Sequence, residues 1–144
     1  MNAMLRQRFL QQYAQTSVQT GVENATPHRL VQMLYEGVLD RIAQAKGAIL
    51  RKDLEAKANL TNKIMDILTH LQSSLDIEKG GEVAENLHRL YEYMHRQVFA
   101  ASRDNDTAKL DEVSVLIREI KVAWDEMPEE YRRMGKEEIT KLSS

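Results

Sequence analysis

The chain of 144 residues contains only two prolines, Pro27 and Pro128, so the stretch between them has few places where a helix must break. Apolar residues recur along that stretch at steps of three and four residues. This spacing puts them on one side of an α-helix. The pattern predicts an all-α protein.

Four segments carry such an apolar stripe. The first, about 24 residues long, opens at Thr26-Pro27, because threonine caps free backbone N–H groups and proline suits the first helical position. Asp53 is a natural cap for the second segment, and Gly80-Gly81 marks the end of one helix and the start of the next. Residues 104–106 precede the fourth segment, which Pro128 closes. The stripes are Leu30, Leu34, Val38, Ile42, Ala45 and Ile49; Thr61, Ile64, Leu68, Leu71 and Leu75; Val83, Leu87, Leu90, Met94, Val98 and Ala101; and Leu110, Val113, Ile117, Ile120 and Trp124.

Short connections decide how these helices pack. A connection of a few residues cannot carry the chain to the far end of a helix, so neighbouring helices run antiparallel. We therefore predict an antiparallel up-down four-helix bundle over residues 26–128. Residues 1–25 contain a short amphipathic piece with Leu5, Phe9, Leu10 and Tyr13, and are expected to form a strap helix and a loop. Residues 129–144 are expected to be a flexible charged tail.

The composition excludes several classes of protein. The 20 basic and 22 acidic residues give a nearly neutral chain, which lacks the basic excess that nucleic-acid binding needs. The absence of cysteine excludes disulfides and thiolate metal sites. No run of about 18 apolar residues is present, and no apolar stretch follows the charges at the start. We expect a soluble, cytoplasmic protein with no direct membrane insertion.

The most suggestive catalytic signal is Glu-x-x-His, which occurs at residues 85–88 and again at 92–95. Di-iron four-helix bundles use this spacing, but they take the two motifs from two different helices. Here both motifs fall on one predicted helix, about 10 Å apart along its axis. No phosphate-binding loop and no nucleophile motif appears either. We therefore expect no enzyme activity, no metal and no cofactor.

The remaining polar signals have plain structural explanations. Residues 104–106, Asp-Asn-Asp, lack the glycine and the later glutamate of a calcium loop, and are expected to form a turn and a cap. His28 and His70 have no partner at metal-ligand spacing, and are expected to lie at the surface or at the rim of the core.

Adaptable apolar side chains are more numerous than a narrow bundle seam needs. The chain has seven methionines and five tyrosines, and the stripes are wider than a strict seam. Such residues fill a core or its rim, and they are also common where a groove accepts a partner helix. Both interpretations stay open at this point. The extending residues are Met33, Leu34, Tyr35, Leu39, Met65, Ile67, Tyr91 and Tyr93.

Five blocks of sequence, in order, resemble the flagellin-specific export chaperones, the FliS family. The most specific block is ATPHRLVQMLYEG at residues 25–37, preceded by Tyr13 and Val18. The others are SLDIEKGGE at 74–82, AENL at 84–87, LYEYM at 90–94, and Asn105-Asp106 followed by Leu110, Val113, Ile117 and Ala123-Trp124. The resemblance covers nearly all of the predicted bundle, and the tail after Pro128 shows no family pattern.

The resemblance implies a cytoplasmic chaperone that binds the disordered C-terminal segment of flagellin. Such a chaperone prevents premature polymerisation and delivers flagellin to the flagellar type III export apparatus. The residues expected to form the flagellin-binding groove are Leu34, Tyr35, Leu87, Tyr91 and Met94. Leu10 and Tyr13 are expected to dock the loaded chaperone to the export-gate protein. The alternatives are a metal-binding bundle and a purely oligomerising bundle.

Overall fold

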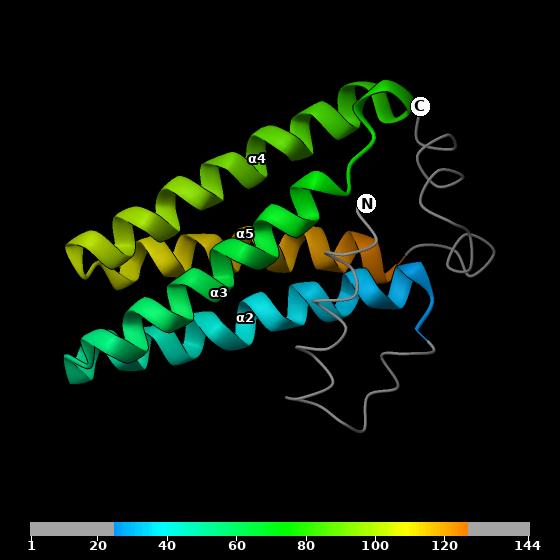
Figure 1. Ribbon diagram of the computed structural model, residues 1–144. Helices are drawn as coiled ribbons and strands as arrows, with labels where there is room; N and C mark the ends of the chain where they lie inside the picture. The colour runs from blue at the N-terminus through cyan, green and yellow to red at the C-terminus, as the bar shows by residue number, and fades with distance from the viewer. Residues whose placement is uncertain (1–24, 127–144) are drawn as a thin grey trace.

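The computed structural model describes residues 25–126, which form four α-helices and contain no strand (Figure 1). The helices are α2 (Pro27–Arg51), α3 (Leu54–Ser73), α4 (Ile77–Asp104) and α5 (Thr107–Asp125). Each helix packs against its neighbour in sequence, and α5 also packs against α2, so the four helices form a closed ring. The predicted all-α bundle is confirmed. The predicted strap helix and the tail 129–144 lie outside the described residues.

Side-chain caps fix where each helix begins. Thr26 Oγ1 accepts a hydrogen bond of 3.1 Å from the backbone N–H of Arg29, as the sequence predicted. Asp53, Asp76 and Asp106 cap α3, α4 and α5 in the same way. These bonds satisfy backbone donors that have no partner inside the helix.

Two of the three turns between the helices use left-handed backbone, whereas Ser74 at the end of α3 is right-handed. Lys52 (φ 58°) ends α2 and Asn105 (φ 53°) ends α4. The predicted turn and cap at residues 104–106 is therefore confirmed. The predicted break at Gly80-Gly81 is a kink inside α4, where Gly81 has φ 55° and ψ −137°.

The kink at Gly81 corrects one detail of the predicted third stripe. Val83 was expected in the core, but its side chain is half exposed, and the buried face of the long part of α4 begins at Ala84. The non-helical backbone at Gly81 gives the following helix a new direction. Val83 lies in the first turn after this change of direction, at the end of the packed helix rather than along its length.

The core lies inside the ring and draws on all four helices. Its fully buried members include Val38 and Ile42 of α2, Ile64 of α3, Val98 of α4 and Val113 of α5. Within the described residues, no helix is long and apolar enough to span a membrane.

Candidate functional site

Four of the five predicted groove residues lie in the core. Leu34, Tyr35, Tyr91 and Met94 have between 0% and 3% of their surface exposed, and Leu87 is half-buried against the same core cluster. The structure therefore brings the five residues into one cluster, but most of that cluster is closed to the surface. Whether they contact flagellin stays a prediction.

The centre of this cluster is a pair of tyrosines. The hydroxyl oxygens of Tyr35 and Tyr91 lie 2.9 Å apart in one buried hydrogen bond. Burial raises the pKa of Tyr35 to about 12 and raises that of Tyr91 well above its usual value. Both hydroxyls therefore stay neutral, and one donates to the other. The bond ties α2 to α4, which are not neighbours in the ring.

The width of the α2 stripe follows from the position of this helix in the ring. The three consecutive residues Met33, Leu34 and Tyr35 are all buried. Such a run covers most of the circumference of a helix, because successive residues turn by 100°. Periodicity alone could not separate a helix covered on several sides from a helix beside an open groove.

Apolar side chains that do reach the surface lie elsewhere. Two of them, Val115 and Val122, are half exposed on α5. Val115 lies one turn after Asp111, whose carboxylate pairs with Lys46 of α2. Val115 also lies one turn after Glu112, whose carboxylate accepts hydrogen bonds from Tyr93 and Gln97 of α4. Because residues three or four apart share a helix face, Val115 and Val122 lie on the outer face of α5, between its flank toward α2 and its flank toward α4. The large exposed apolar residues of the described chain are Leu50, Leu54, Ile77, Val83, Phe99, Val115 and Val122.

Phe99 lies on a different side of the bundle. It follows His95 by one turn and precedes Ser102 by one turn, and these two residues contact Thr69 and Thr61 of α3. The 57% exposed ring of Phe99 therefore lies on the flank of α4 toward α3. The guanidinium of Arg103 lies 5.9 Å from the centre of this ring. The α3–α4 flank and the α2–α5 flank are opposite sides of the ring.

The two histidines of the Glu-x-x-His motifs connect α4 to α3. Gln72 Nε2 lies 3.1 Å from a ring nitrogen of His88, and Thr69 Oγ1 lies 3.2 Å from Nε2 of His95. Burial lowers the pKa of His95, against the opposing charges of Glu92 and Asp66. No group of three or more potential metal ligands exists within residues 25–126.

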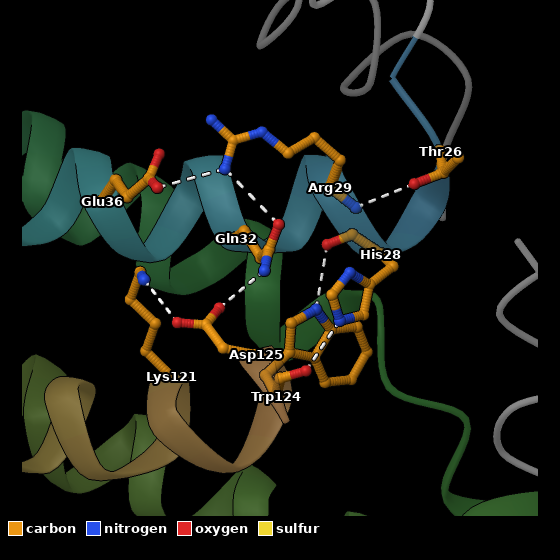
Figure 2. A network of polar contacts seen from close by, with 8 residues as sticks. All are labelled: Thr26, His28, Arg29, Gln32, Glu36, Lys121, Trp124 and Asp125. Carbon is orange, nitrogen blue, oxygen red and sulfur yellow. Dashed lines mark hydrogen bonds and ion pairs between the residues drawn. The ribbon is translucent and has the colours of Figure 1, made fainter. Parts of the chain in front are cut away.

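His28 and His70 correct the sequence prediction, because both are buried rather than at the surface or rim. His28 Nε2 donates to the backbone oxygen of Trp124 (2.7 Å), and Trp124 Nε1 donates to the backbone oxygen of His28 (2.9 Å). The two rings are stacked, with centroids 5.2 Å apart and planes 8° apart. Figure 2 shows this clasp between the start of α2 and the end of α5. The partners are 96 positions apart in the sequence, so no local signal pointed to the clasp.

A second layer of polar contacts supports the clasp (Figure 2). Gln32 Nε2 donates to one carboxylate oxygen of Asp125, and Lys121 Nζ pairs with the other, both at 2.6 Å. Burial acts to raise the pKa of Asp125, but these two hydrogen bonds outweigh it and leave the pKa below its usual value. Asp125 is therefore a carboxylate at neutral pH.

The fold and these contacts define a small all-α protein, a closed four-helix bundle with apolar side chains exposed on the α3–α4 flank and on the outer face of α5. The family model for the flagellar protein FliS matches residues 9–131, and the chain belongs to the FliS family. It is 46% identical over 122 residues to the flagellar secretion chaperone FliSB of Pseudomonas aeruginosa, covering 85% of this chain and 97% of that protein. It is 40% identical over 130 residues to the flagellar secretion chaperone FliS of Vibrio cholerae, covering 90% and 96%. The FliS of Salmonella typhimurium is 38% identical over 116 residues, covering 80% and 86%.

Proposed function

We propose that this protein is a cytoplasmic, non-enzymatic chaperone that binds the disordered C-terminal segment of flagellin before export. Its relatives are named flagellar secretion chaperones, which supplies the class of client. The structural observation that supports the proposal is the placement of the exposed apolar side chains. Phe99 lies on the α3–α4 flank, whereas Val115 and Val122 lie on the outer face of α5, on another side of the bundle.

This placement favours a client that wraps around the bundle. A single helix docked in one groove would contact one side of the bundle only. It would leave either Phe99 or the exposed valines of α5 in water. A disordered chain can reach both flanks and orders as it binds. Such interfaces bury on the order of 1,000–3,000 Å², and ordering consumes some 2–5 kcal/mol or more of the interaction energy. The complex can therefore be specific and still release its client.

Binding would protect flagellin by covering its own apolar surface until export. The bound chaperone would then hand flagellin to the flagellar type III export apparatus. Leu10 and Tyr13, which lie outside the described residues, are proposed to dock the loaded chaperone to the export-gate protein. No step in this scheme requires nucleotide hydrolysis or a cofactor on the chaperone.

The predicted groove residues differ in how they could contact the client. Leu87 can contact the client directly, because it is half-buried. Leu34, Tyr35, Tyr91 and Met94 can contact it only if the bundle opens locally, because they are core residues. An aspartate at one of these four positions would place a charge in the core and unfold the protein. Binding tests therefore need the exposed residues.

The test is titration calorimetry with a peptide of about 40 residues from the C-terminus of flagellin. We expect a one-to-one complex, a gain of helix in circular dichroism and a negative heat-capacity change. The variants Phe99→Ser and Val122→Ser should each weaken binding roughly fivefold, because each removes about 1 kcal/mol of apolar contact. The double variant should lose the product of the two effects.

The matched control is Ala123→Ser, an exposed position that follows Val122 but points in a different direction on α5. It should bind as the unmodified protein does. If only one of Phe99 and Val122 matters, the client occupies one flank and does not wrap around the bundle. If the unmodified, folded protein does not bind the peptide at all, flagellin is not its client.

A further inference from the structure

The last two turns of α5 are held less firmly than the rest of the bundle. The buried residues of α5 end at Ile117, and residues 118–125 include no fully buried side chain. Ile120 and Trp124 pack against the core only in part. By contrast, the first turns of α2, which face this end of α5, include the buried residues His28, Leu30 and Met33. The attachment of residues 118–125 therefore depends strongly on polar contacts.

These polar contacts also add to the local cap at the end of α5. The last turn of α5 contains no basic residue, and its C-cap Glu126 has right-handed rather than left-handed backbone. The backbone N–H of Glu126 bonds to the backbone oxygens of Val122 and Trp124, and the Trp124 oxygen has room for a second donor. His28 of α2 donates to it, and the indole N–H of Trp124 returns a bond to α2. The end of α5 is thus also capped by another helix.

The contacts with α5 lie on one stripe of α2. His28 and Gln32 are four residues apart and both bond to the end of α5. Tyr35 follows Gln32 by three residues and continues the same stripe. Residues 118–125 therefore cover a face of α2 that leads directly to the buried Tyr35–Tyr91 pair.

We propose that residues 118–125 form a flap, which the clasp between His28 and Trp124 holds closed as a latch. When the flap opens, it uncovers this stripe of α2 for an apolar segment of the client. The proposal rests on the proposed function for the identity of that client. It explains how residues that are closed to the surface in this structure become available for binding. The flap is the part of α5 whose release leaves the buried residues Leu110, Val113 and Ile117 in place.

Amide hydrogen exchange on the full chain tests the latch without any ligand. In His28→Ala, we expect the amides of residues 118–126 to exchange at least tenfold faster, while those of α3 and α4 keep their rates. Gln32→Ala removes the bond to Asp125 and leaves the clasp itself intact, so it should give a smaller effect at the same residues. The control is His95→Ala, which removes a histidine contact between α3 and α4 and should leave residues 118–126 unchanged. If all four helices exchange faster together in His28→Ala and Gln32→Ala, the variants loosen the whole bundle and there is no latched flap. The same conclusion follows if the exchange of residues 118–126 does not change.

The association rate of the flagellin peptide tests whether the client enters through the open flap. When a protein must open before it binds, only the open fraction of molecules can bind, so both its apparent affinity and its observed association rate are lower. His28→Ala should therefore bind the peptide severalfold faster than the unmodified protein, and His95→Ala should not. Equal or slower association of His28→Ala would show that the client does not enter through the flap. If the unmodified protein does not bind the peptide, the proposed function fails and the role in client entry fails with it, while hydrogen exchange still decides whether the latch exists.

Discussion

Tyr35 and Tyr91 place two hydroxyl groups in a mostly apolar core, and each hydroxyl is the hydrogen-bond partner of the other. A buried polar group without a partner costs more than the hydrogen bond itself contributes, because it has lost water without gaining a replacement. The pair is therefore stable only as a pair. The sequence predicted that the two residues lie near each other, but not that their hydroxyls meet inside the bundle.

Tyr35→Phe and Tyr91→Phe should each reduce the free energy of unfolding by about 1–3 kcal/mol, because each leaves one buried hydroxyl without its partner. The double variant should be more stable than the sum of the two losses predicts, because no hydroxyl remains. Urea unfolding of the four proteins measures this coupling. Strictly additive losses would mean that the hydroxyls do not depend on each other.

His95 should make the stability of the protein depend on pH. Burial lowers its pKa in the folded state below the ordinary value of 6.5. At a pH between the two values the unfolded chain binds more protons than the folded protein, so the free energy of unfolding falls as the pH falls below about 6.5. The effect is complete once the pH is below the folded-state pKa.

The variant His95→Gln should therefore lose less stability than the unmodified protein between pH 7.5 and pH 5. Glutamine cannot titrate, yet it can still form a hydrogen bond with Thr69. Thermal unfolding of both proteins at the two pH values measures the difference. Identical losses would show that His95 titrates equally in the folded and unfolded states.

At the scale of the helices, local sequence decided most boundaries. Four side-chain caps begin the four helices; Thr26 and Asp53 were predicted from sequence, as was a turn and cap at residues 104–106. The end of α5 differs, because its terminal carbonyl is bound by His28 of α2 in addition to the nearby backbone N–H of Glu126. Contacts between distant helices carry no local signature, and this explains why the clasp could not be predicted.

Gly81 is the position where a helix depends on glycine. Gly81→Ala should destabilise the protein by about 1–3 kcal/mol, because a side chain at φ 55° strains the backbone. No atom lies within 4 Å of the added methyl group, so the loss would come from the backbone and not from a clash. Urea unfolding measures it.

The matched control is Gly47→Ala in the interior of α2. The added methyl group there meets only the end of the flexible Arg51 side chain, at 3.0 Å. Alanine is favoured over glycine in a helix by about 1 kcal/mol, so this variant should be as stable as the unmodified protein or slightly more stable. An equal loss at both positions would contradict the role assigned to the backbone of Gly81.

At the scale of the whole molecule, the ring of helices separates two kinds of apolar side chain. One kind fills the interior, and includes most of the residues predicted to form a groove. The other kind is exposed at the helix ends, on the α3–α4 flank and on the outer face of α5. The proposed wrapping of a flagellin segment uses the second kind directly, and reaches the first kind only through the proposed flap. The two proposals can fail independently, since hydrogen exchange reports on the flap without a client.

The sequence by itself determined the helical class, the order of the four helices and their antiparallel packing, because periodicity, caps and short connections are local properties. The family resemblance also rested on local blocks, and the match to FliS confirmed it. Only the tertiary structure decided which stripe residues are core and which are exposed, that His28 and His70 are buried, and that His28 meets Trp124. Burial depends on every neighbour that covers a side chain, and those neighbours come from helices far away in the sequence.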